Sequence, residues 1–151
     1  MAPPKTMSGK QLLVQIGDGA EPEVFAHDCL INTERGIAFA AETNRETIPD
    51  CDDPDAPGWS EITVSGQSAT ISGAGRLHTT SVSEWFDWFT SGEGKNVRVL
   101  LNGVSLANGG GHWAGVFKLT AWEVTGPETG RAAVSVTLES DGVVTWVDAA
   151  A

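Results

Sequence analysis

Residues 58–89, GWSEITVSGQSATISGAGRLHTTSVSEWFDWF, contain both a long strand pattern and the one convincing helix pattern in the chain. Residues 68–77 alternate between polar and apolar or small side chains, which is the period-2 signature of a β-strand. Ser81 and Glu84 then form an S-x-x-E pattern, which is typical of a capping box at a helix start. Gly92 suits the left-handed residue that ends many helices, so we expect a helix of about ten residues here.

The predicted helix is strongly apolar on one face. The side chains spaced at i, i+3, i+4 and i+7 are Val82, Trp85, Phe86 and Phe89. Each large ring has roughly 150–250 Å² to bury, so this face is predicted to form the core against a sheet. Trp88 flanks the stripe. Burial in the core together with the other three aromatic side chains is favoured on base rates, and if Trp88 is exposed it is a candidate for contact with a partner subunit.

Composition indicates a single all-β domain. Among 151 residues there are 18 glycines, and the remaining patterns outside the helix are strand-like. We expect a flexible N-terminal arm over residues 1–10, without periodicity, and one domain over residues 11–151. Further strands are predicted at residues 11–16, 23–26, 29–32, 37–42, 96–101, 112–125, 131–139 and 143–147, with a turn or bulge at 34–36.

Charge and cysteine content exclude several classes of protein. Lys and Arg total 9 against 20 Asp and Glu, which gives a net charge of −11 and argues against gripping a nucleic-acid backbone. Cys29 and Cys51 are the only cysteines and have no metal-ligand spacing, so neither a cofactor nor a disulfide framework is predicted. No hydrophobic run is long enough to span a membrane, and the N-terminus lacks a signal-peptide core, so we expect synthesis in a cytoplasm.

The least regular stretch is residues 43–58, TNRETIPDCDDPDAPG, which is predicted to be a long loop. Its charged side chains are Arg45, Glu46, Asp50, Asp52, Asp53 and Asp55. Five carboxylates in one short stretch cannot be buried without cations. They are therefore solvated, bind a metal or face a basic partner. The spacing fails as an EF-hand, because Pro54 occupies a ligand position and Asp55 the position that needs Gly.

No catalytic constellation is visible. His27, His78 and His112 are far apart in sequence, and no nucleophile pattern accompanies any of them. The sequence therefore predicts a non-enzymatic protein.

In its order of motifs the chain resembles the major tail tube proteins of long-tailed phages and gene transfer agents. The residues that carry the resemblance are 11–16, the acidic loop ending in Gly58-Trp59-Ser60-Glu61, residues 67–75, 115–122 and 134–142. The resemblance implies a β-sandwich or partial barrel, similar to tail-tube and Hcp proteins, with one flanking helix. Six copies would form a ring with a closed inner barrel, and the rings would stack into a tube.

The resemblance also assigns expected roles to parts of this chain. Residues 43–58 would reach an adjacent ring, and their acidity would need a basic partner there. The candidates, among which the sequence does not choose, are Lys95, Arg98, Lys118 and Arg131. Six copies would carry 6 × −11 = −66, and an acidic bore would let DNA pass without specific binding.

Further partners follow from the same resemblance. They are a tape measure protein, a tail terminator and distal tail or baseplate proteins, in a virion tail assembled in the cytoplasm of a bacterial host.

A second reading of the sequence is a secreted β-sandwich that binds carbohydrate, with surface tryptophans and an acidic calcium loop. Six tryptophans without tyrosine favour that reading, whereas the absence of a signal-peptide pattern does not.

Overall fold

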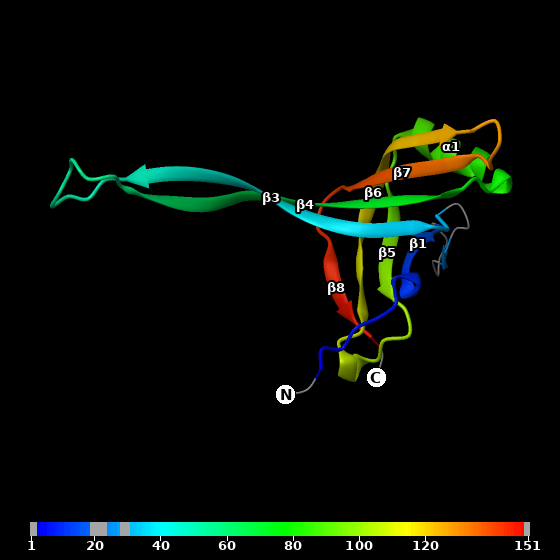
Figure 1. The fold of residues 1–151 in the computed structure, drawn as a ribbon, viewed down its shortest axis with the longest axis horizontal. Helices are drawn as coiled ribbons and strands as arrows, with labels where there is room; N and C mark the ends of the chain where they lie inside the picture. The colour runs from blue at the N-terminus through cyan, green and yellow to red at the C-terminus, as the bar shows by residue number, and fades with distance from the viewer. Residues whose placement is uncertain (1–2, 19–23, 28–30, 150–151) are drawn as a thin grey trace.

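The strands form one curled, antiparallel sheet in a computed structural model that describes residues 3–18, 24–27 and 31–149. The strands are β1 (Leu12–Gly17), β2 (Phe25–His27), β3 (Glu34–Ile48), β4 (Trp59–Arg76), β5 (Lys95–Leu101), β6 (Gly111–Thr125), β7 (Ala133–Ser140) and β8 (Thr145–Asp148). Their order across the sheet is β2-β1-β5-β6-β7-β4-β3, and β8 pairs with the start of β6. The all-β, partial-barrel prediction is confirmed (Figure 1).

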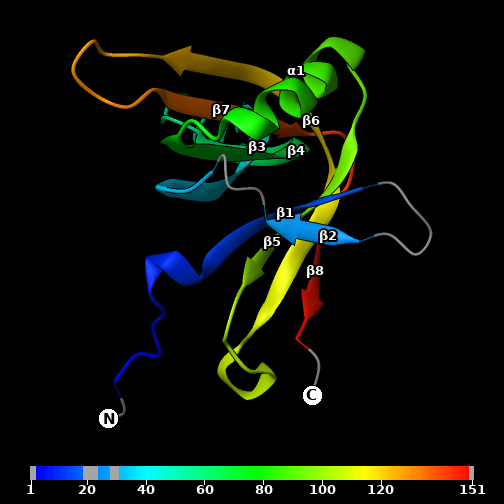
Figure 2. The same cartoon turned by 90° about the vertical axis from the view of Figure 1, so that its right-hand side faces the viewer.

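The α-helix α1 (Val82–Ser91) follows β4 and precedes β5 along the chain (Figure 2). It is followed by Gly92, whose φ of 67° is left-handed as predicted. The Ser81 side chain makes no capping hydrogen bond to α1, so the predicted capping box does not form. A short 3-10 turn, Thr79–Ser81, leads directly into the helix and already gives Ser81 helical backbone angles. The chain thus enters α1 from a turn rather than from the extended backbone that a capping serine prefers.

The predicted core face of α1 is partly wrong. Trp85 and Trp88 are 2% and 4% exposed, whereas Phe86 and Phe89 are 51% and 42% exposed, and Val82 is half-buried. Trp88 is therefore not free for a partner subunit. Its indole Nε1 donates to the Glu93 carbonyl at 2.8 Å, which satisfies the one polar atom of a buried ring.

The core lies between α1 and the inner face of the curled sheet. It combines the two tryptophans with residues of five strands, which are Val14, Val97, Val99, Phe117, Leu119, Ala69, Ile71, Val134, Val136 and Leu138, and with Ile31. The alternation in residues 131–139 predicts that Ala132, Val134, Val136 and Leu138 point inward, and the last three are buried in the structure.

Two predicted boundaries are corrected by the structure. Residues 34–36 begin β3 rather than forming a turn, and residues 43–48 continue it, so only residues 49–58 form a loop.

In β6 the register shifts between Leu119 and Ala121, so the alternation predicted for residues 112–125 breaks there. The extra residue turns Trp122, instead of Ala121, toward the core side. Of the strand predicted at 23–26, residues 25 and 26 lie in β2 and residue 23 lies outside the described residues. Of the strand predicted at 29–32, residues 29 and 30 lie outside the described residues, and the prediction is wrong for residues 31 and 32, which are not in a strand.

Candidate assembly surfaces

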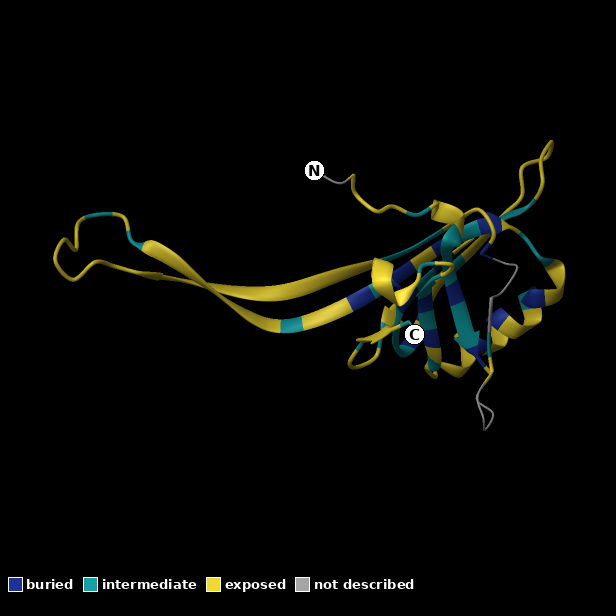
Figure 3. Cartoon of the chain, turned by 90° about the horizontal axis from the view of Figure 1, so that it is seen from below, coloured by how far each residue is buried: buried dark blue, intermediate teal, exposed yellow. Residues whose placement is uncertain are grey.

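The longest feature of the molecule is a two-stranded arm, residues 43–64, formed by the distal halves of β3 and β4 and the loop between them. It projects from the body (Figure 1), and nearly all of it is exposed on both faces (Figure 3). A register shift at Glu42/Thr43 marks where it leaves the body. A two-stranded ribbon without a packed face is only marginally stable in water.

The arm exposes large apolar side chains as well as charges. Trp59 is 89% exposed, and Ile48, Ile62 and Val64 are each at least half exposed. The sequence analysis overlooked these four residues, because apolar residues fall on both faces of residues 59–64 and give no single stripe. Exposed apolar groups concentrated on one projection are typical of an interaction surface.

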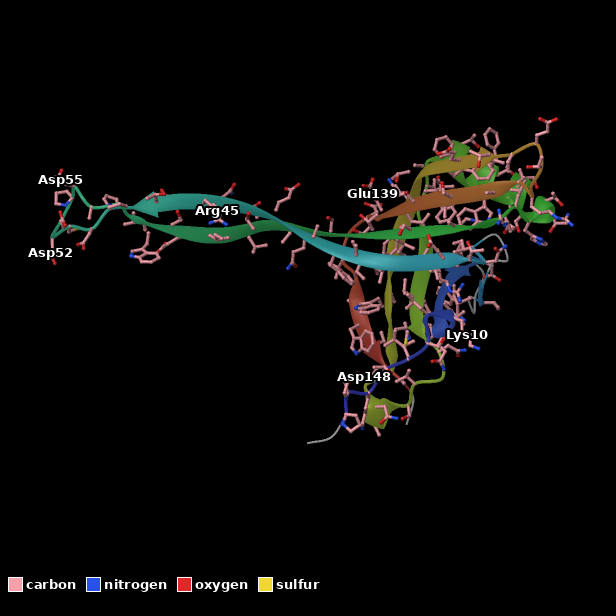
Figure 4. All side chains as sticks on the ribbon, viewed as in Figure 1. Lys10, Arg45, Asp52, Asp55, Glu139 and Asp148 are labelled. Atoms are coloured by element: carbon pink, nitrogen blue, oxygen red, sulfur yellow. The ribbon has the colours of Figure 1, made fainter. Side chains whose placement is uncertain are left out.

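The predicted loop residues are distributed along the arm. Arg45 and Glu46 lie in β3, and Glu46 is paired directly with Glu61 of β4. The four aspartates, Asp50, Asp52, Asp53 and Asp55, lie in the loop at the end of the arm (Figure 4). We call these four residues the acidic tip. The Asp52 amide donates to Asp50 Oδ1 at 2.9 Å, which shapes the loop locally.

The second surface is a bare sheet face, opposite to α1, on the body parts of β3, β4, β7 and β6. Residues paired in the register share a face, so the alternation assigns its members. They are Glu34, Gly36, Ala38, Ala40 and Glu42; Gly66, Ser68, Thr70, Ser72, Ala74 and Arg76; Ala133, Ser135, Thr137 and Glu139; and Lys118, Ala121, Glu123 and Thr125. We call this surface the open face. Four carboxylates and two cations give it a net charge of −2.

The sheet formed by these four strands has an unpaired edge on each side in the described part of the chain. β3 is the last strand of the sheet, and in the described part of the chain no strand pairs with its outer edge. β6 pairs with β5 only from residue 112 to residue 117, so residues 118–125 are bound on one side alone, by β7. Unpaired edges invite strand addition by another chain.

A third surface is the outer side of α1. Phe86 and Phe89 are exposed there, and Phe86 lies 6.5 Å, between ring centroids, from the half-buried Trp122 of β6. Val124 next to it is 44% exposed. The helix is thus apolar on both sides, since Trp85 and Trp88 fill the core behind it.

A further aromatic cluster joins the base of the arm to β8. The Trp113 ring lies 5.6 Å from Phe39 and 5.0 Å from Trp146, between centroids. Phe39 also lines a hollow of about 620 Å³ between the base of the arm and the β7–β8 corner. In β6 next to Trp113, burial and then the charge of Arg98 lower the pKa of His112 below its ordinary 6.5.

The four cations predicted to face a partner have different surroundings. Lys95 Nζ lies 5.2 Å from the Trp88 ring centroid, and Arg98 stacks 3.6 Å from that of Phe25. Lys118 Nζ lies 3.6 Å from Asp141 Oδ2. Arg131 is exposed in the loop between β6 and β7. The structure does not bring these four residues together.

No metal-binding or membrane-spanning feature is found in the part of the chain that the structure describes. No group of three or more His, Cys, Asp or Glu side chains converges within those residues. None of the helices in the described ranges is long and apolar enough to cross a membrane.

Comparison with solved structures gives matches over nearly the whole chain. A chain in the tail of an empty gene transfer agent particle, refined with C6 symmetry, superposes with a TM-score of 0.76 at 24% identity, covering 94% of this chain and 99% of that one. A chain of a native gene transfer agent virion gives 0.72 at 23%, with the same coverage. A chain of an extracellular contractile injection system sheath–tube complex gives 0.61 at 16%, covering 95% and 93%.

Among curated protein sequences no relative matches this chain. A family model described as phage tail tube protein matches residues 6–146, which is nearly the full length. The superpositions cover nearly all of the fold described above, and neither comparison favours the carbohydrate-binding alternative. The chain belongs to the phage tail tube protein family, whose members are structural, non-enzymatic components of virion and gene transfer agent tails.

Proposed function

We propose that six copies of this chain form a ring, that the rings stack into a tube, and that the open face lines a bore that conducts DNA. The observation that carries this proposal is the two-sided character of β3, β4, β7 and β6. One face of these strands is filled by α1 and the core, and the other is bare and built mainly from Gly, Ala, Ser and Thr. The sixfold number is supported by the C6 symmetry of the similar gene transfer agent tail.

Ring closure follows from the two unpaired edges. The outer edge of β3 in one copy would pair with residues 118–125 of β6 in its neighbour. Each copy would then contribute four strands, so that six copies close a barrel of 6 × 4 = 24 strands. Closure removes every exposed edge of the inner sheet, which a single domain cannot do for itself.

The arm supplies the contact between rings. Its apolar residues and its acidic tip are solvated in the free subunit, and its own two strands cannot bury them. An arm lying across a subunit of the adjacent ring would cover both. The N-terminal arm, residues 1–10, is a second candidate for contacts between copies.

The bore that this assembly creates would be weakly acidic. Of the net charge of −11, the open face carries only −2, because most carboxylates lie on the arm and elsewhere on the surface. Short hydroxyl and methyl side chains offer DNA no row of guanidinium or ammonium groups. The two cations of the open face, Arg76 and Lys118, are outnumbered by its carboxylates, so little counterion release accompanies contact and DNA would slide past without lasting binding.

The remaining partners are those of a tail. A tape measure protein would occupy the bore during assembly, and a tail terminator and distal tail or baseplate proteins would meet the tube ends. Chains in an anti-feeding prophage baseplate and in its tube-terminating cap superpose with TM-scores of 0.65 and 0.54. We place assembly in the cytoplasm of a bacterial host.

Cysteine labelling tests which face lines the bore. Ser68 lies on the open face and Ser83 on the exposed side of α1, so each is changed to Cys in a chain in which Cys29 and Cys51 are Ser. A bulky polymer-linked maleimide should label both variants as free subunits. In assembled tubes it should label only Ser83→Cys. Labelling of Ser68→Cys with protection of Ser83→Cys would reverse the assignment of the faces.

A further inference from the structure

Most of the nine cations have partners within their own chain. Lys5 donates to Asn108, Arg35 to the carbonyls of Lys10 and Leu12, Lys95 and Arg98 face aromatic rings, and Lys118 pairs with Asp141. For the other four no ion pair, hydrogen bond or ring contact of the side chain is found in the described residues. They are Lys10, Arg45, Arg76 and Arg131.

Two of these free cations are close together. Arg76 is the last residue of β4 and pairs in register with Ala133, the first residue of β7. The next residue, Leu77, donates its amide to the Ala132 carbonyl at 2.9 Å. Arg131 precedes Ala132 in the β6–β7 loop and therefore lies at the same end of the sheet as Arg76. Both side chains are exposed, and no carboxylate in the described part of the chain forms an ion pair with either. We call Arg76 and Arg131 the arginine pair.

The arginine pair and the acidic tip lie at opposite ends of the molecule. β4 runs from Trp59, next to the acidic tip, to Arg76, and 18 strand residues span roughly 60 Å. In Figure 1 the arm tip and the β6–β7 loop mark the two ends of the long axis. The two groups therefore cannot meet within one chain, although their charges are complementary.

We propose that the arginine pair of one copy binds the acidic tip of a copy in the adjoining ring; this rests on the proposed stacking of rings. The contact is heterologous, joining different surfaces of two copies, so it propagates along an axis instead of closing on itself. A solvent-exposed ion pair contributes little alone, but a ring would make six such contacts at once. Arg131 is thereby selected from the four cations predicted by sequence, and Arg76 is added.

Charge reversal in purified protein tests the contact. R76E/R131E places like charges together, and D52K/D53K places two lysines opposite the arginine pair and removes the net negative charge of the acidic tip; each should raise the protein concentration needed for tube formation by about a hundredfold or more. The chain carrying all four changes keeps the net charge of −11 and should form tubes again. R76K/R131K retains both positive charges and serves as the matched control, which should still assemble.

Tubes are scored by sedimentation and negative-stain microscopy, and the thermal unfolding midpoint of each free subunit confirms that it is folded. The proposal is overturned if R76E/R131E assembles like the wild type, or if the fourfold variant fails to recover assembly while remaining folded. A wild-type chain that forms no tubes would instead contradict the proposed function, so the two failures are distinguishable.

Discussion

Glu46 of β3 lies directly opposite Glu61 of β4 in the arm, so two carboxylates share one cross-strand pair. Like charges in this position destabilise a ribbon, typically by a few tenths to about 1 kcal/mol. The arm also lacks a packed face of its own. The free subunit therefore holds its arm less tightly than its body, and a partner that supplies cations or apolar surface would order it.

The first prediction concerns this pair. Glu61→Gln removes the repulsion but keeps the size of the side chain, so amide hydrogen exchange across residues 43–48 and 59–64 should slow in the free subunit. Exchange in the core strand β7 should stay unchanged and serves as the internal reference. Equal exchange rates in the arms of the variant and the wild type would show that the paired carboxylates do not weaken the ribbon.

The second prediction contrasts the two sides of α1. Trp85→Ala empties a fully buried position and should cost about 3–5 kcal/mol in the free energy of unfolding. Phe86→Ala removes a ring that is half exposed, so its cost should be less than half as large. Denaturant unfolding of both variants gives the comparison. Equal losses would mean that Phe86 packs into the core as tightly as Trp85.

The third prediction separates assembly from folding. Trp59→Ala changes a side chain that is 89% exposed, so the free energy of unfolding should stay within about 0.5 kcal/mol of the wild type. Tube formation should nevertheless require more protein, because in the proposed tube the indole is covered by another copy. Sedimentation across a concentration series measures this. An unchanged threshold would remove Trp59 from the contact between copies.

The fourth prediction uses His112, whose pKa is lowered by burial and by Arg98. The unfolded chain binds a proton at higher pH than the folded chain, so this contribution to stability is complete above the ordinary pKa of 6.5 and declines as pH falls below it. His112→Gln should therefore lose less stability than the wild type between about pH 7.5 and about pH 5. A larger loss in the variant would contradict the direction of the shift.

The sequence was most informative where one side of an element is buried. Val134, Val136 and Leu138 alternate against the core, and their strand was predicted with the correct inward face. The sequence pattern predicts the helix in the correct place, but the helix carries two overlapping apolar stripes. The stripe with Phe86 predicts one core face, whereas the buried side is set by Trp85 and Trp88. Local spacing cannot decide between two apolar stripes when the position of the sheet is unknown.

The arm was missed for a different physical reason. Residues 43–48 bury nothing within their own chain, so neither face carries the alternation that identifies a strand. Their pairing with residues 59–64 depends on continuation of a ladder that starts inside the body. Arg76 was missed as a candidate because its freedom from other contacts depends on the corner formed with residues 131–133, which no local pattern encodes.

Helical reconstruction of tubes assembled from the purified chain tests the central claim most directly. We expect stacked six-membered rings in which the open face of β3, β4, β7 and β6 lines the bore, α1 lies outside it and each arm reaches the next ring. A protein that stays monomeric at high concentration, or a tube with α1 facing the bore, would contradict the account.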